Sequence, residues 1–267
     1  MRIRAKVAAV TVTATALSAA LAVTALAAPA VADGQDETPT KITNIDVNHS
    51  RDSTVVVGAA LKTRFLISAT AYDPSGIRSV SFELEHQTNA GEVDGRIAQI
   101  GPSHCVKVDA TTSKCESVMI ADPNTNLYTN AVAGAWGINV VAVDGQGDVT
   151  RENYLPLARI KRQTQLSQAD ATPEPVKKGN AVTVKARMLV ASWEQHKDVP
   201  LVGHQVLLQF RTGTTGAFKT VQKVKTDRNG WAKGTVKATV DGQYRYDFAG
   251  TSLTQARSGA ADFVDVK

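Results

Sequence analysis

Histidine and cysteine side chains are the ones in this chain that most often carry out catalysis or bind metal. The five histidines fall in predicted loops or at strand starts, without a nucleophile at a catalytic spacing; they are His49, His86, His104, His196 and His204. No Gly-x-Ser-x-Gly, His-Glu-x-x-His or phosphate-binding glycine loop is present. We therefore expect a protein that is not an enzyme. A triad assembled from residues distant in sequence is the open alternative.

Cys105 and Cys115 are the only cysteines, and the segment between them is short and rich in turn formers. In an exported chain such a pair meets an oxidising environment, so we predict a disulfide that clamps a hairpin. In the chain-entropy description, closing so small a loop stabilises the fold by roughly 3 kcal/mol. The alternative is a metal site of His104 with both thiolates, which lacks a fourth ligand and a common zinc spacing.

Three aspartates in two predicted turns suggest a calcium site. Asp73 begins the turn Asp73-Pro74-Ser75-Gly76, while Asp144 and Asp148 enclose the second turn. If the two turns share one end of a sandwich, their oxygens suit a hard cation such as calcium. The alternative is ordinary turn chemistry, since Asp and Gly are common turn residues. No other cofactor is expected.

An aromatic residue beside lysines suggests a binding surface for an acidic polymer. Trp231, Lys233 and Lys237 share one side of a predicted strand, and Lys223 and Lys225 lie on a strand that could be its neighbour. An exposed aromatic ring next to ammonium groups can stack on sugar while the charges neutralise phosphate. The alternative is that Trp231 packs over the sheet edge.

Alternation of apolar and polar residues predicts the strands that position these groups. In residues 203–247 we predict a meander of four consecutive strands, with tight turns at Asn229-Gly230 and Asp241-Gly242. The predicted inward faces of this region are Val206, Leu208 and Phe210; Ala232, Gly234, Val236 and Ala238; and Tyr244, Tyr246 and Phe248. Elsewhere they are Phe65, Ile67, Ala69 and Ala71; Val80, Phe82 and Leu84; Trp136, Ile138, Val140 and Ala142; and Val182, Val184, Ala186, Met188 and Val190.

The first residues read as a signal peptide. A basic start, an apolar Ala/Val/Leu-rich run and Ala30-Val31-Ala32 predict cleavage after residue 32. A membrane anchor is the alternative, but threonines and a serine interrupt the run and no positive stop follows it. We expect a disordered lead at 33–40, a first sandwich at 41–158, a linker at 159–179 and a second sandwich at 180–267.

The two halves carry opposite net charge. Residues 33–160 contain 10 Lys and Arg against 16 Asp and Glu, a net of −6, whereas residues 161–267 contain 17 against 9, a net of +8. The basic half could face a polyanion, or the two halves could complement each other. The alternative is a solvated surface on each half, since the charges are scattered.

Residues 42–158 look like bacterial immunoglobulin-like domains of secreted proteins. The likeness rests on Ala71 to Val80, which fits A-x-D-x-x-G-I-x-x-V, and on Trp136 to Thr150, which fits W-x-[IV]-x-V-x-A-x-D-x-x-G-x-x-T. It departs at Asp148, where Asn would be commoner. Residues 180–267 resemble a β-sandwich module of exported proteins from high-GC Gram-positive bacteria, through Val206 to Arg211, Thr226 to Gly230, Tyr244 to Ser252 and Asp262 to Lys267. That module is largely uncharacterised, so the resemblance implies no catalytic residues.

The expected fold class is therefore all-β, with two immunoglobulin-like antiparallel β-sandwich domains in tandem after an N-terminal signal peptide. The expected function is that of a secreted, extracellular, non-enzymatic binding or structural protein of the cell surface. The alternatives are a calcium-binding immunoglobulin-like module and an accessory or inhibitor protein for an exported enzyme. Expected partners are a cell-wall polymer or another exported protein. Nucleic acid is not expected, nor is a membrane after cleavage.

Overall fold

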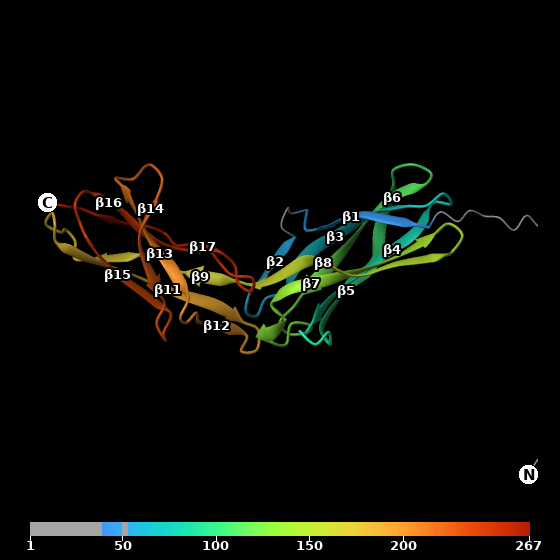
Figure 1. Ribbon diagram of the computed structural model, residues 1–267, viewed down its shortest axis with the longest axis horizontal. Coiled ribbons are helices and arrows are strands. Elements are labelled where there is room, and N and C mark those ends of the chain that lie inside the picture. Colours follow the sequence, from blue (N-terminus) through green and yellow to red (C-terminus); the bar gives the residue numbers. More distant parts are fainter. Residues whose placement is uncertain (1–38, 50–52) are drawn as a thin grey trace, which may run out of the picture. The chain divides into compact units, whose positions relative to one another are not determined.

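The computed structural model describes residues 39–49 and 53–267, and its regular elements there are strands apart from one short 3-10 helix (Figure 1). The predicted signal peptide, residues 1–32, and residues 33–38 of the predicted lead lie outside the described residues. The predicted all-β class, with two sandwiches in tandem, is confirmed.

Eight of the described strands build the first sandwich, in the order β1-β3-β6-β5-β4-β7-β8-β2. Neighbouring strands are antiparallel except β2 and β8, which are parallel. Along the chain the elements are β1 (Lys41–Val47), β2 (Thr54–Val57), β3 (Thr63–Tyr72), β4 (Ile77–Gln87), β5 (Val93–Lys107), β6 (Thr112–Ala121), the 3-10 helix η1 (Asn130–Val132), β7 (Gly134–Asp144) and β8 (Val149–Arg162).

Strand β5 runs through both layers of this sandwich. Its residues 93–98 pair with β4, whereas residues 99–107 pair with β6. At the change of partner, the three residues 101–103 of β5 lie opposite the single residue Ser117 of β6. Bulges and bends of this kind allow one strand to turn the corner between two packed layers.

Side chains replace the backbone hydrogen bonds that β4 loses where β5 departs. Gln99 Oε1 accepts a hydrogen bond from the amide of Phe82 at 2.7 Å, and Ser103 Oγ donates to the carbonyl of Val80. Ser103 Oγ also lies 2.5 Å from Ser117 Oγ. Buried backbone groups need partners, so these polar side chains stabilise the corner.

The predicted inward faces of the first half form its core. The side chains expected on these faces are buried: Phe65, Ile67, Ala69, Ala71, Val80, Phe82, Leu84, Trp136, Ile138, Val140 and Ala142. Trp136 is fully buried, and its indole Nε1 donates to the carbonyl of Val132 at 2.8 Å. The alternation of apolar residues therefore predicted correctly which side of each strand faces inward.

The second sandwich has two layers, each of five described strands. In one layer, β11 (Ala181–Ser192) pairs with β9 (Thr164–Leu166), β10 (Asp170–Thr172), β12 (Lys197–Pro200) and β15 (Trp231–Lys237). The other layer contains β13 (Gln205–Thr212), β14 (Lys219–Lys225), β16 (Gly242–Phe248), β17 (Arg257–Ser258) and β18 (Asp262–Val264).

Buried side chains from both layers meet in the second core. These are mainly Val182, Val184, Ala186, Met188 and Val190 of β11, with Val206, Leu208, Tyr244, Tyr246 and Phe248 of the opposite layer. The hydroxyl of Tyr246 donates to the carbonyl of Val184 at 2.9 Å, which joins the two layers. Burial raises the pKa of Tyr246 to about 12.

The predicted four-strand meander in residues 203–247 is wrong. Strands β13 and β14 pair as a hairpin, but β15 crosses to β11 in the other layer, and β16 returns to β13. The turn at Asn229-Gly230 exists, with the amide of Gly230 donating to the carbonyl of Asp227 at 3.0 Å, yet it joins two layers. The physical reason lies in the small inner face of β15: a Cβ on Gly234 would come within 2.9 Å of Leu208 in the opposite layer.

About half of the segment predicted as a linker, residues 159–179, is strand. It contains the end of β8 and all of β9 and β10. The amide of Gln163 donates to the carbonyl of Val57 at 2.9 Å, and its own carbonyl accepts from the amide of Ala191 at 2.9 Å. Main-chain pairing therefore continues through the segment, and the domain boundaries drawn from the sequence stay predictions.

Replacing Gln99 by Leu should lower the free energy of unfolding by about 1–3 kcal/mol, because the buried amide of Phe82 loses its acceptor. Urea unfolding followed by tryptophan fluorescence measures this change. The matched control is Gln146→Leu, in an exposed turn, which should change stability by less than about 0.5 kcal/mol. Equal stability of the Gln99→Leu variant and the wild type would show that the corner does not depend on this side chain.

Candidate functional site

The outer side of strands β11 and β15 carries the strongest candidate surface. Because Ala232 and Gly234 point into the core, Trp231, Lys233 and Lys237 point outward, and all three are exposed. Trp231 is 41% exposed, which is unusual for an indole ring. The alternative, that Trp231 packs over the sheet edge, stays open, because among the described strands β15 pairs only with β11 and part of the ring is covered.

Strand β11 adds further cations to this surface. In the ladder, Lys185 lies directly opposite Lys233, and Arg187 lies opposite Trp231. Asp170 on β10 adds a carboxylate, whose Oδ2 lies 3.1 Å from Nζ of Lys185. We call this surface the basic face and define it by Thr183, Lys185 and Arg187 of β11 and Trp231, Lys233, Thr235 and Lys237 of β15.

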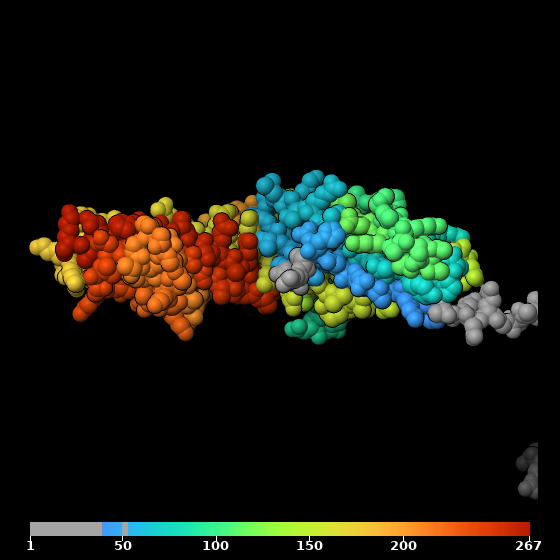
Figure 2. All heavy atoms as spheres, turned by 90° about the horizontal axis from the view of Figure 1, so that it is seen from above, coloured from blue at the N-terminus to red at the C-terminus, as the bar shows by residue number. Residues whose placement is uncertain are grey.

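The structure does not bring all five residues of the predicted polymer site together. Lys223 and Lys225 lie on β14, which pairs with β13 in the other layer. They alternate with Val224, which packs against the core, so they are exposed on the outer side of that layer. Figure 2 shows the β13–β14 region, drawn in orange, at the surface. The basic face therefore contains Trp231, Lys233 and Lys237 only.

The predicted disulfide between Cys105 and Cys115 is present. The two cysteines lie directly opposite each other in the β5–β6 ladder, with a Cα–Cα distance of 4.0 Å. Cys115 is fully buried. Both sulfur atoms are used in this bond, so neither cysteine serves as a nucleophile or a metal ligand.

Asp73 holds its turn through both carboxylate oxygens. Oδ1 accepts from the backbone amide of Ser75 at 2.8 Å and from its hydroxyl at 2.6 Å, and Oδ2 accepts from the hydroxyl of Thr40 at 2.9 Å. Thr40, expected in the disordered lead, is buried. Burial raises the pKa of Asp73, but the hydrogen bonds from Ser75 and Thr40 outweigh it, so this pKa lies below its ordinary value.

Asp144 organises the neighbouring turn in the same way. Its Oδ1 accepts from the amides of Gln146, Gly147 and Asp148 at 2.8, 2.7 and 2.9 Å. The two turns lie side by side, since the amide of Gly145 donates to the carbonyl of Gly76 at 2.9 Å. Across residues 39–49 and 53–267, no three His, Cys, Asp or Glu side chains form a group that could hold a metal ion. Calcium binding by Asp73, Asp144 and Asp148 stays a prediction.

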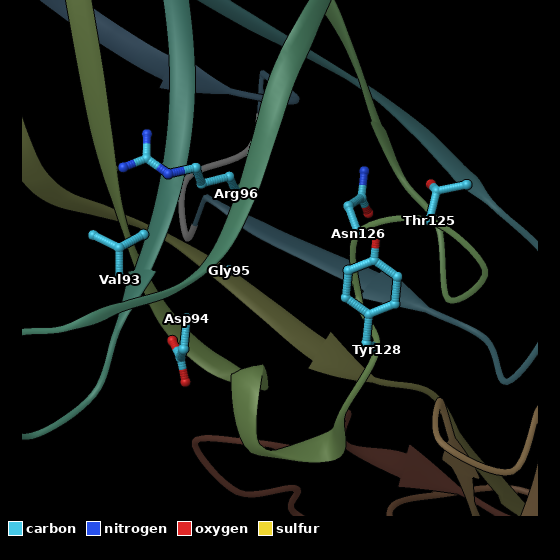
Figure 3. A pocket seen from close by; sticks show the side chains of 7 residues that line it. All are labelled: Val93, Asp94, Gly95, Arg96, Thr125, Asn126 and Tyr128. Atoms are coloured by element: carbon cyan, nitrogen blue, oxygen red, sulfur yellow. The ribbon is translucent and has the colours of Figure 1, made fainter.

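A hollow of about 320 Å³ lies between the start of β5 and the loop that follows β6 (Figure 3). Strand β5 contributes Val93, Asp94, Gly95 and Arg96, and the loop contributes Thr125, Asn126 and Tyr128. The ring of Tyr128 is 69% exposed. The hollow therefore offers an aromatic face next to polar groups.

The ionic groups of this hollow are already paired. Nδ1 of His86 lies 2.5 Å from Oδ1 of Asp94, and Nη1 of Arg96 lies 3.1 Å from Glu83 and 2.6 Å from Glu85. Because Arg96 has two carboxylate neighbours, the hollow lacks the uncompensated positive charge of the basic face. Where the structure describes the chain, no helix has the length and apolar character needed to cross a membrane.

Comparison with known proteins gives no family and no function. No known family matches the chain, and no curated protein matches it. Among solved structures, it is similar to dimeric latent PorU from Porphyromonas gingivalis, with 14% identity, a TM-score of 0.31 and coverage of 86% of this chain but 20% of PorU. It is similar to a marsupial T cell receptor, with 10% identity, a TM-score of 0.38 and coverage of 85% of this chain and 73% of the receptor chain. It is also similar to fibronectin(III)-like modules of CbhA from Clostridium thermocellum, with 14% identity, a TM-score of 0.33 and coverage of 85% of this chain and 93% of that chain.

These low TM-scores carry no argument about function, and this chain spans only a fifth of the PorU chain. The predicted resemblance of residues 180–267 to a module of exported proteins stays a prediction. Lys185 and Arg187 were missed as members of the basic face. The alternation along β11 was a signal that Lys185 and Arg187 lie on the side opposite Val184 and Ala186. The sequence did not indicate that β11 pairs with β15.

Ionised Asp73 should stabilise the fold at neutral pH but not in strong acid. Its pKa is lower in the folded than in the unfolded chain, where it is about 3.9, so its contribution is present above that pH. The contribution is lost as the pH falls through the lower folded pKa. We expect the stability difference between wild type and Asp73→Asn to shrink on acidification below about pH 4, measured by urea unfolding. A difference independent of pH would contradict this assignment.

Calcium binding at the two turns predicts a melting temperature that rises in calcium and returns to its starting value in chelator. Calorimetry of the wild type and of Asp148→Asn measures the effect, which should be absent in the variant. Identical melting curves of the wild type in calcium and in chelator would exclude the site.

Proposed function

We propose that this protein is an exported, non-enzymatic binding protein whose basic face binds an acidic polymer of the cell surface. The polymer would carry phosphate or carboxylate groups on a sugar-containing chain. The disulfide supports export, because such bonds persist mainly in oxidising compartments. The calcium-binding and accessory-protein functions, which were the alternatives from the sequence, stay predictions without a specific observation in their favour.

The observation that carries this proposal is the pair of lysines directly opposite each other on an exposed sheet. Like charges at cross-strand positions destabilise a sheet, so Lys185 and Lys233 together have an energetic cost. Asp170 compensates Lys185. Lys233 has no ion pair within the described residues. A bound anion would relieve the repulsion, as expected of a binding surface.

Trp231 supplies the second part of the recognition. Its exposed ring lies opposite Arg187 in the ladder, and Arg187 Nε donates to the carbonyl of Asn229 at 3.2 Å. The ring can stack on a sugar while the neighbouring cations contact acidic groups of the same polymer. An exposed sheet surface of this kind suits an extended polymer better than a small ligand, which prefers a concave site.

The double variant Lys185→Gln/Lys233→Gln should bind purified wall polymer about tenfold more weakly than wild type at low salt, because two adjacent positive charges are removed from the basic face. Trp231→Ala should weaken binding by a similar factor through loss of stacking. Sedimentation with wall fragments, with and without teichoic polymer, measures the bound fraction. Wild-type binding should also fall as the salt concentration rises.

Lys107→Gln is the matched control, since it removes an exposed strand lysine of the first sandwich and should leave binding unchanged. Retention of the double variant equal to that of wild type, or wild-type retention that salt does not alter, would overturn the proposal.

A further inference from the structure

Two arginines and one phenylalanine form a second charged cluster, on the layer opposite the basic face. Arg211 lies on β13 and Arg245 on β16, and both alternate with buried residues, so they share the outer side of that layer. The guanidinium carbons of Arg211 and Arg245 lie 4.5 and 4.0 Å from the ring centroid of Phe218. One ring therefore contacts both positive charges. We call Arg211 and Arg245 the arginine pair.

Neutral acceptors fix the orientation of the arginine pair. Nε and Nη2 of Arg211 donate to Oε1 of Gln243 at 2.9 and 2.6 Å, and its Nη1 donates to the carbonyl of Gly216 at 3.4 Å. Nε of Arg245 donates to Oε1 of Gln209 at 2.9 Å. Glutamine oxygens position a guanidinium without neutralising it, so both side chains are ordered while their charge remains.

The arginine pair has no carboxylate partner in the part of the chain that the structure describes. Asp247 is the acid on the same side of β16, but its Oδ1 accepts from Ser258 Oγ at 2.5 Å and it forms no ion pair with either arginine. Within the same described residues, the two Nη groups of Arg245 donate to no acceptor. These N–H groups are oriented and free.

Two preorganised guanidinium groups without a counter-ion are suited to one ligand class. A guanidinium presents parallel N–H donors that match the oxygens of phosphate, and two of them match its double charge. Lys223 on the neighbouring β14 extends the positive charge across this layer. A bound anion would offset the remaining repulsion between the two cations.

We propose that Arg211, Phe218 and Arg245 form a binding site for a phosphate group. The site lies on the layer opposite the basic face and is independent of the proposed function. Its ligand is the phosphate oxyanion itself, whether free or carried by a larger molecule. Phe218 is a positioning residue, because its ring orients both guanidinium groups.

The test is titration of the full chain with inorganic phosphate at constant ionic strength and neutral pH. Nuclear magnetic resonance of the arginine Nε–H groups reports binding at Arg211 and Arg245 directly, and calorimetry gives the affinity. We expect Arg245→Gln and Arg211→Gln to weaken phosphate binding at least tenfold, and Arg245→Lys to have a smaller effect because the charge is kept. Phe218→Leu should weaken binding about threefold while both arginines remain.

Two further experiments compare free phosphate with phosphate carried by a larger molecule, and distinguish this site from the basic face. Methyl phosphate should bind as inorganic phosphate does, whereas acetate at equal ionic strength should bind at least tenfold more weakly. The Lys185→Gln/Lys233→Gln variant should bind inorganic phosphate like wild type, because its substitutions lie on the basic face. Wild-type affinity in either arginine-to-glutamine variant, or equal binding of acetate and phosphate, would overturn this site without affecting the basic face.

Discussion

The burial of one side of β11 is the constraint on which the second sandwich depends. Its twelve residues pair with four other strands, and its inner side supplies five core positions. Side chains alternate along a strand, so burying Val184 and Ala186 forces Lys185 and Arg187 outward. The pairing with β15 then places Trp231 and Lys233 beside them. Packing of the core and composition of the basic face therefore follow from one register.

The same register explains why charge collects on two separate surfaces. Core packing uses the inner side of both layers, and the basic residues of the second half must occupy the outer sides. On one layer the uncompensated charges are lysines beside an exposed indole, while on the other they are arginines ordered by glutamine oxygens. The first half differs, because Arg96 meets both Glu83 and Glu85. The difference in net charge between the two halves is therefore visible in how their individual arginines and lysines are paired.

The sequence predicted which side of each strand is buried, but it did not predict which strands pair. Alternation along a strand is local, so the inward sides of residues such as Phe65, Trp136 and Val182 could be predicted one strand at a time. Pairing depends on residues far away in the chain, which is why β15 was assigned to the wrong neighbour and the two lysines of β14 to the wrong surface. The small inner face of Ala232 and Gly234 was the available signal for a strand pressed against an opposite layer.

A strand that belongs to two layers has a mechanical consequence. In an ordinary sandwich the layers are held by side-chain packing and can slide past each other under shear. In the first sandwich β5 is covalently continuous through both, and the disulfide ties its end to β6. Relative sliding of the two layers would have to break the pairing of β5 with β4 or with β6, so this strand couples the movements of the two layers.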